Sequence, residues 1–288
     1  MASVVVTSFG PIIVKDSELA GLAFGAWRLS AAALVLHLVL RATGGNQTRD
    51  KLRRSLPSGM IFGVNVAFFF TAVKATSVAN ASLIATSQPI VLLFLGQRMF
   101  GERTRLWHVA LTAIAIGGAS LVILGANDAE TGDLRGDLLA VAAMVAFALY
   151  LAFGKQARAG LGTIELQAGQ MLGASIVVVP LAVAFRQDFF VPDTKSYLLI
   201  GLMILGPGLG HVLMNYAHAH VPLIAVSLLN LAVPVFASAW AWFLLDETVV
   251  WLQVLGMVIT LGSLSAVVLL GRRSAGGDSD SADQGTEV

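Results

Sequence analysis

The stretch that decides the fold runs from His211 to Val268 and reads HVLMNYAHAHVPLIAVSLLNLAVPVFASAWAWFLLDETVVWLQVLGMVITLGSLSAVV. It contains two apolar runs, Pro222–Leu245 and Val249–Leu270, on either side of a short acidic turn. Each run has about the 20 apolar residues that an α-helix needs to cross the roughly 30 Å hydrocarbon core of a bilayer. The stretch therefore predicts two transmembrane helices joined by the turn Asp246–Thr248.

The same pattern occurs once more, 145 residues earlier in the chain. Identical residues are paired at this offset without a gap: Ala217 with Ala72, Ser227 with Ser82, Pro234 with Pro89, Glu247 with Glu102, Gly262 with Gly117 and Ser265 with Ser120. A fixed offset indicates an internal duplication. We expect one membrane unit over residues 1–126 and a second over 138–271, joined by an outer loop over 127–137. The Gly/Ser/Asp-rich end, 272–288, is expected to be a disordered tail.

The composition is that of a polytopic membrane protein. Of the 288 residues, 57% are hydrophobic and only 12% are charged, and the mean hydropathy is +0.81. A soluble domain carries about 25% charged residues, which it needs to cover its surface. A net charge of +1 with no basic stripe argues against nucleic acid as a partner. The absence of cysteine excludes disulfides, thiolate metal sites and cysteine nucleophiles.

Hydropathy predicts an all-α membrane protein with ten transmembrane helices, five in each repeat. The first apolar run, 4–14, is too short to span, because about a dozen helical residues reach only about 18 Å. It is expected to be a truncated first helix or a short, tilted or interfacial one. The other nine predicted spans are 19–40, 57–73, 78–95, 107–126, 138–153, 164–185, 197–216, 222–245 and 249–270.

The placement of Lys and Arg predicts the orientation. These residues concentrate in alternate connections, at 41–54, 98–105, 155–158 and 272–273. By the positive-inside rule these connections, and both termini, are expected in the cytoplasm. Because five is an odd number of spans, the second repeat is then inverted relative to the first. Inverted repeats are typical of secondary transporters, which hold their substrate near the membrane midplane between the repeats.

Several short motifs, in this order and spacing, resemble the EamA branch of the drug/metabolite transporter superfamily. They are Arg28 within Ala26-Trp27-Arg28-Leu29, the paired Pro89…Gly101-Glu102-Arg103 and Pro234…Asp246-Glu247-Thr248, and Gly154-Lys155-Gln156-Ala157-Arg158. The resemblance covers about residues 9 to 270. It implies a cell-membrane transporter of small metabolites such as amino acids, acting in many members as an exporter, with no cofactor.

Arg28 is the one basic residue near the middle of a predicted span. An Arg at a helix centre costs roughly 2.5–3.5 kcal/mol on insertion scales, so backbone carbonyls, water or an anionic substrate must offset that cost. Two interpretations stay open. Arg28 either contacts a substrate carboxylate, or ties neighbouring helices together through their backbone carbonyls.

Other polar and aromatic residues within spans are candidates for the substrate site, although helix packing would also explain them. They are Asn65, Phe69, Gln88, His211, Asn215, Ser227 and Asn230. Pro89, Pro207 and Pro234 are expected to break their spans and serve as hinges, because proline removes a backbone donor and frees a carbonyl one turn earlier. Glu102 and Glu247 precede the fifth and tenth spans and are expected to cap them.

The sequence favours a secondary transporter that works by alternating access. No phosphate-binding loop, HExxH or GxSxG motif is present, which argues against an ATPase and an intramembrane hydrolase. No acidic residue lies at mid-membrane, so proton coupling and facilitated diffusion both stay open. Export of amino acids or related compounds is the leading hypothesis, with a passive channel or a non-transport membrane protein as the alternative. The expected partners are the lipid bilayer and a small-molecule substrate, with a homodimer left open, and no metal is expected.

Overall fold

The computed structural model describes residues 2–75, 84–102, 104–125, 133–189, 194–245 and 249–283, and some of them, including all of 271–283, by backbone alone. Within these residues the fold is entirely helical, as predicted. The helices are α1 Ala2–Thr7, α2 Gly10–Asp16, α3 Gly21–Ala42, α4 Arg49–Ala75, α6 Gln88–Phe100, α7 Leu106–Gly125, α8 Leu134–Arg158, α9 Thr163–Ala184, α10 Thr194–Met203, the π-helix η1 Ile204–Gly208, α11 Leu209–Ala217, α12 Leu223–Asn230, α13 Val233–Leu245 and α14 Trp251–Asp283.

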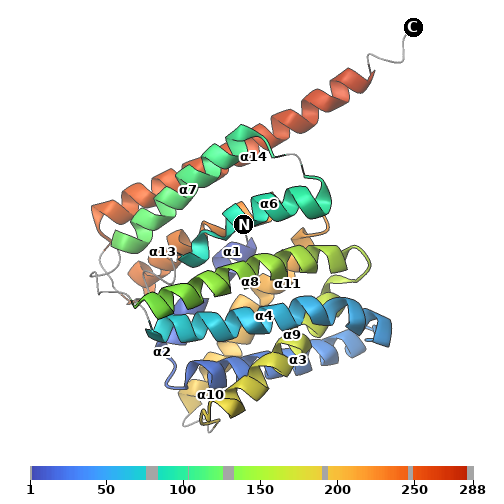
Figure 1. The fold of residues 1–288 in the computed structure, drawn as a ribbon, viewed down its shortest axis with the longest axis vertical. Helices are drawn as coiled ribbons and strands as arrows, with labels where there is room; N and C mark the ends of the chain where they lie inside the picture. The colour runs from blue at the N-terminus through green and yellow to red at the C-terminus, as the bar shows by residue number, and fades with distance from the viewer. Residues whose placement is uncertain are drawn as a thin grey trace.

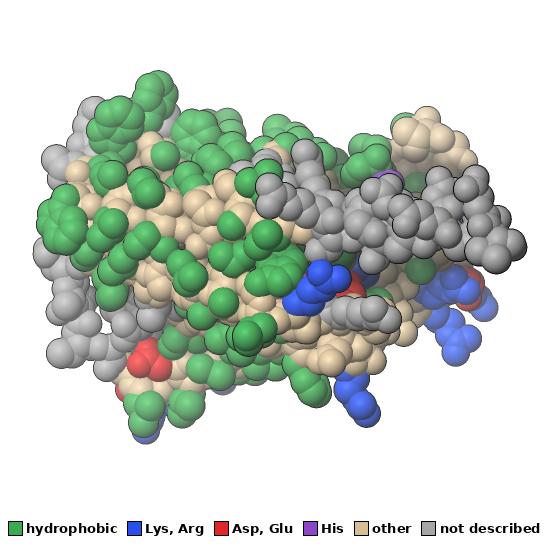
Figure 2. All heavy atoms as spheres, turned by 90° about the horizontal axis from the view of Figure 1, so that it is seen from above, with side chains coloured by type: hydrophobic (Ala, Val, Ile, Leu, Met, Phe, Trp, Pro, Cys, Tyr) green, Lys and Arg blue, Asp and Glu red, His purple; other side chains and the backbone are tan. Residues whose placement is uncertain are grey.

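Seven stretches of helix in the described residues are long and apolar enough to cross a membrane. They are Gly21–Ala42, Arg49–Ala72, Leu106–Gly125, Leu134–Arg158, Thr163–Ala184, Thr194–Ala217 and Leu223–Trp240. Their outer faces are apolar: Leu34, Leu198 and Leu205 are 63%, 63% and 72% exposed. Figure 2 shows hydrophobic side chains spread over one face, with Lys and Arg gathered mainly towards one end. Such a surface suits contact with lipid and not with water.

The largest layer of the structure contains α8, α4, α9 and α3, stacked in this order in Figure 1. Glycines allow α4 and α9 to approach closely. A Cβ atom on Gly63 of α4 would lie 2.7 Å from the carbonyl oxygen of Ala174, and one on Gly173 of α9 would lie 2.7 Å from that of Leu56. Small residues at helix interfaces are a usual means of packing in membranes, where burial of apolar surface drives association only weakly.

A second helix pair, α7 and α14, lies beside α6 and apart from this layer (Figure 1). The two helices meet through Gly118 and Gly256. A Cβ atom on Gly118 would lie 2.8 Å from the backbone nitrogen of Thr260, and one on Gly256 would lie 2.7 Å from that of Val122. The predicted fifth and tenth spans are therefore direct neighbours.

The predicted first span is two short helices, α1 and α2, and not one. Pro11 lies in the first turn of α2, where its missing N–H costs no hydrogen bond. Both segments pack on the second half of the chain. Ser3 Oγ donates to the carbonyl oxygen of Gly210 at 2.7 Å, and Trp240 Nε1 donates to Ser8 Oγ at 3.1 Å.

The predicted fourth and ninth spans are interrupted near Pro89 and Pro234. Neither proline kinks a continuous helix. Pro89 lies at the start of α6, just after a turn at Ser87. In the ninth span α12 ends at Asn230 and α13 begins at Val233, so Pro234 lies in the first turn of α13. Proline is tolerated there because the first helical N–H groups have no partner within the helix. The break precedes the proline in both cases.

The eighth and tenth spans also differ from a simple helix. Pro207 lies inside η1, a single π turn that joins α10 to α11. At the C-terminal end, α14 continues to Asp283, into the segment for which composition predicts a disordered tail. Adding a residue to an existing helix is far less costly than starting one, so a packed helix can extend into a sequence that would not form a helix alone.

Candidate functional site

Arg28 on α3 is buried inside the helical layer, with 9% of its surface exposed. Its guanidinium carbon lies 5.8 Å from the ring centre of Phe62 and 5.9 Å from that of Phe70, both on α4. Nε has no hydrogen-bond partner in the part of the chain that the structure describes. Cation–π contact with two rings partly offsets the loss of water, but leaves this guanidinium donor available.

Tyr150 on α8 and His211 on α11 lie beside this arginine. The Tyr150 hydroxyl lies 3.3 Å from His211 Nδ1, and both side chains are buried. The Phe62 ring contacts both, with its centre 4.7 Å from that of the Tyr150 ring and 5.0 Å from that of the His211 ring. Arg28 interacts electrostatically with both. We call Arg28, Phe62, Phe70, Tyr150 and His211 the Arg28 cluster; α3, α4, α8 and α11 contribute to it.

A chain of amide groups lies one turn further along α11. Asn215 is fully buried, and its Nδ2 donates to Oε1 of Gln167 and, at 2.6 Å, to Oε1 of Gln170, both on α9. Gln170 Nε2 in turn donates to Ser58 Oγ on α4 at 3.1 Å. Asn215 Oδ1 has no partner among the described residues. Asn215, predicted as a substrate residue, thus joins α11 to α9 directly and, through Gln170, to α4.

Asn65 and Phe69 share the helix face of Phe62, at spacings of three and seven residues. Asn65 Nδ2 donates to the carbonyl oxygen of Ala143 on α8 at 2.8 Å, so this amide holds α4 against α8. Phe69 is half-buried and packs beside Phe70, with the ring centres 6.3 Å apart. Both residues lie near the Arg28 cluster. The contacts that they make are helix-packing contacts, which was the alternative to a role in substrate binding.

Gln88, Ser227 and Asn230 are linked to the Arg28 cluster by no contact that the described residues show. Gln88 is buried at the start of α6, with Oε1 unpartnered among the described residues. Ser227 Oγ donates to the carbonyl oxygen of Ile224 within α12. Asn230 Nδ2 lies 4.0 Å from the Met214 sulfur. These three residues stay predictions as substrate contacts.

Glu102 caps a helix, but not the one that follows it in sequence. Its carboxylate accepts hydrogen bonds from the backbone N–H groups of Leu223, at 2.7 Å, and Ile224, at 3.2 Å, which open α12. Lys155 of α8 forms an ion pair with it at 2.8 Å. The expectation that Glu102 caps the fifth span is wrong, because the carboxylate of Glu102, two residues after α6, reaches the free N–H groups of α12 in the second half of the chain. Glu247 lies outside the described residues.

Three residues of interest were missed by sequence reasoning: Phe62, Lys155 and His218. The spacing of Phe62 from Asn65 and Phe69 could have placed it on the same face. His218 is only 4% exposed. Its seven-residue spacing from His211 was the available signal. Nothing in the sequence indicates the partners of Lys155, since they belong to distant segments.

Comparison with known families matches one family twice along the chain, over residues 1–124 and again over 134–269. The chain belongs to the EamA-like transporter family. It is therefore a multi-pass membrane protein of a family of transporters within the drug/metabolite transporter superfamily, as the motifs indicate.

Two relatives of this EamA-like chain carry functional names. It is 24% identical over 242 residues to the pseudopaline exporter CntI of Pseudomonas aeruginosa, covering 81% of each chain. It is 26% identical over 234 residues to a probable amino-acid metabolite efflux pump of Escherichia coli, covering 74% of this chain and 77% of the relative. A solved crystal structure with no functional description superimposes with a TM-score of 0.81 at 20% identity, covering 94% of this chain and 96% of that one. The last likeness concerns the fold alone.

Proposed function

We propose that this protein exports small metabolites that carry a carboxylate, amino acids or related compounds, across the cell membrane by alternating access. The observation that carries the proposal is Arg28, a buried cation whose Nε has no hydrogen-bond partner among the described residues. The family membership and the two relatives named as an exporter and an efflux pump support transport outwards.

The surroundings of Arg28 favour a carboxylate. A guanidinium binds a carboxylate through two parallel hydrogen bonds when both partners are free of water. Tyr150 supplies a hydroxyl donor next to it, and the rings of Phe62 and Phe70 supply apolar surface. In this proposal Arg28 binds the carboxylate of the substrate, and Tyr150 and His211 hold its polar remainder.

Helix contacts support the ten-span, inverted-repeat arrangement, with units over 1–126 and 138–271. In the proposed duplication α3 corresponds to α9, and α7 corresponds to α14. The two helices of each corresponding pair are in contact. In the same way α4 corresponds to α11, and α8 corresponds to α1. The contact of α4 with α8 therefore has a counterpart in the contact of α11 with α1, and both contacts are present. The seven long helices, α1 with α2, α6, and the apolar part of α14, Trp251–Val267, would then make up the ten spans. Both termini are proposed to be cytoplasmic.

Efflux from proteoliposomes tests this function. Vesicles containing the full chain are loaded with a pool of amino acids and related metabolites, and efflux is followed by mass spectrometry with and without a pH gradient. We expect selective, saturable efflux of carboxylate-bearing compounds. Arg28→Met should lower their transport efficiency about 100-fold, the loss expected for a charge-assisted, bidentate contact.

Arg41→Met is the matched control, because Arg41 lies exposed at the end of the same helix. It should leave efflux unchanged. Flux that rises linearly with concentration would favour the passive channel. Equal efflux from Arg28→Met and the unsubstituted protein would refute the carboxylate contact. The response to the pH gradient decides between proton coupling and facilitated diffusion.

Pro234 tests the hinges proposed for alternating access. The break between α12 and α13 would act as one flexing point, with those at Pro89 and Pro207. Pro234→Ala should therefore reduce transport more than it reduces folded yield. Equal losses of both would assign this proline a structural role only.

A further inference from the structure

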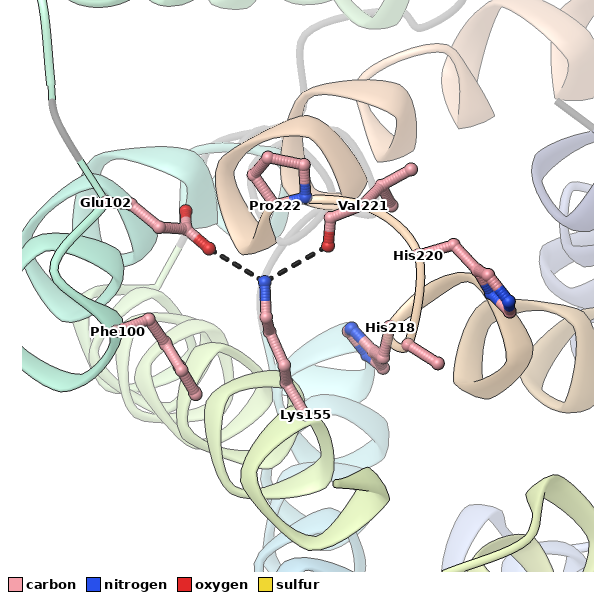
Figure 3. A pocket seen from close by; sticks show the side chains of 8 residues that line it. Phe100, Glu102, Lys155, His218, His220, Val221 and Pro222 are labelled. Carbon is pink, nitrogen blue, oxygen red and sulfur yellow. Dashed lines mark hydrogen bonds and ion pairs between the residues drawn. The ribbon is translucent and has the colours of Figure 1, made fainter. Parts of the chain in front are cut away.

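A second polar site lies at the ends of α6 and α8, away from the Arg28 cluster. Here the turn that joins α11 to α12 borders a cavity of about 430 Å³. Glu102, Lys155 and His218 line it, together with Phe100 and the turn as far as Pro222 (Figure 3). This volume is within the range of small-molecule sites, about 300–1,000 Å³.

Lys155 places one charged group in this cavity. Its ammonium donates to Glu102 Oε1 at 2.8 Å and to the carbonyl oxygen of Val221 at 3.0 Å. An ammonium has three N–H donors. Within the described residues these are its two acceptors, so the third donor is available to a ligand. The ring of Phe100, 5.1 Å away, covers one side of the ammonium.

His218 provides the second group. Although only 4% of its surface is exposed, neither ring nitrogen has a hydrogen-bond partner in the described part of the chain. In Figure 3 its ring points towards the Lys155 side of the cavity. Burial, with Lys155 and Arg158 nearby, lowers the pKa of His218 to about 3. The ring is therefore neutral at pH 7, with one N–H donor and one free acceptor.

We propose that this cavity binds the carboxylate of a small solute, held by the third N–H of Lys155 and the ring N–H of His218. Buried polar atoms are normally paired, so the two unpaired nitrogens of His218 point to a ligand. The positive charges of Lys155 and Arg158 favour an anion, while Phe100 and Val221 offer apolar contact to the rest of the solute. A singly charged carboxylate suits the site better than a phosphate, because the Glu102 carboxylate lies at its wall.

This inference extends the proposed function: in an exporter with this end in the cytoplasm, the cavity is where cargo first binds. A bound carboxylate would also compete with Glu102 for Lys155. Glu102 holds the first N–H groups of α12 in the other repeat, so cargo binding would loosen that connection.

Histidine NMR of the full chain tests the site without requiring transport. The protein, labelled with ¹⁵N at its five histidines, is placed in phosphatidylcholine nanodiscs and titrated with acetate, the simplest carboxylate. Acetamide, of the same shape but neutral, is the matched probe. His218→Gln identifies the signals of His218, and His37→Gln, on α3 and outside the cavity lining, serves as the control variant.

Acetate should shift the His218 signals saturably, and acetamide should not. Lys155→Met should weaken acetate binding about tenfold or more, as expected for one charge-assisted hydrogen bond. His37→Gln should leave the affinity unchanged. Unaltered His211 signals in each variant would establish that the fold is retained.

Absence of a saturable acetate shift, or an equal shift with acetamide, would overturn the proposal. A response only when anionic phosphatidylglycerol replaces the neutral lipid would also overturn it, in favour of a lipid headgroup. The two proposals can fail separately. Acetate binding without efflux would refute the export proposal alone, and efflux without acetate binding would refute this site alone.

Discussion

Lys155 and Glu102 form an ion pair at 2.8 Å that joins the end of α8 to the connection between α6 and α7. Their side chains are only 16% and 12% exposed, so water screens the pair weakly. We predict a coupling of about 1–3 kcal/mol between the two residues in the free energy of unfolding. A double-mutant cycle with Glu102→Gln and Lys155→Met measures it by denaturant unfolding in micelles.

The control is an exposed ion pair of α4, Asp50 with Arg54, whose side chains are 72% and 53% exposed. Its coupling should not exceed about 0.5 kcal/mol, as is usual for pairs four residues apart on a helix surface. Similar coupling energies in the two cycles would mean that burial does not strengthen the ion pair between Glu102 and Lys155.

Gly63→Ala should destabilise the protein by about 1–3 kcal/mol, the usual cost of overpacking. The added methyl group would lie 2.7 Å from the carbonyl oxygen of Ala174, which belongs to the backbone of α9 and cannot move away alone. Gly117→Ala on α7 is the matched control, since its methyl group would meet nothing within 4 Å. Thermal unfolding in micelles compares them, and equal melting temperatures would contradict the close packing of α4 on α9.

Asn215→Ala should lower the free energy of unfolding by about 1–2 kcal/mol, because it leaves the side-chain oxygens of Gln167 and Gln170 without their donor. Asn230→Ala should change it by less than about 0.5 kcal/mol, since Asn230 has only a long contact to a sulfur. Denaturant unfolding measures both. A larger loss for Asn230→Ala would mean that the two asparagines have been assigned the wrong way round.

His218 should make the protein less stable in acid. Its pKa falls from the ordinary 6.5 to about 3 in the folded state, first through burial and then through Lys155 and Arg158. Below about pH 6.5 the unfolded chain binds a proton that the native chain does not. Stability is therefore highest above that pH and falls as the pH is lowered, by up to about 1.4 kcal/mol per pH unit.

His218→Gln should reduce this slope, which unfolding measurements between pH 7.5 and 4.5 would reveal. His220→Gln is the control, because His220 is exposed in the same turn. Glu102 and Lys155 also line the cavity, so the comparison is made between variants at each pH. Parallel curves for the unsubstituted chain and His218→Gln would refute the prediction.

The helical class, the lengths of most spans and the family were predictable from the sequence, because they depend on local composition and on a repeated spacing. Arg28 was predictable as well, since a charge in an apolar run stands out. Its neighbours follow in part: Phe62 shares the face of Asn65 and Phe69, and His211 was named.

Contacts between distant segments were not predictable. Glu102 reaches Leu223 across 121 residues, and nothing near Glu102 in the sequence distinguishes this from capping the next helix. His218 is likewise buried, near Lys155 and Arg158 of α8, which lie about 60 residues earlier in the sequence. The helix breaks near Ser87 and Asn230 were expected at the prolines themselves, but they precede them, since proline is most compatible with the first turn of a helix.

The π turn Ile204–Gly208 gives one membrane span two helical phases. An α-helix rotates by about 100° per residue, so one additional residue in a turn rotates all that follows by about that angle. Leu199 and Ile200, before the turn, pack with Phe24 in an apolar cluster. His211 and Asn215, after the turn, contact the polar side chains of Tyr150 and Gln170. The apolar contacts of α10 and the polar contacts of α11 can therefore be set independently, and loss of a single residue between them would bring them into conflict.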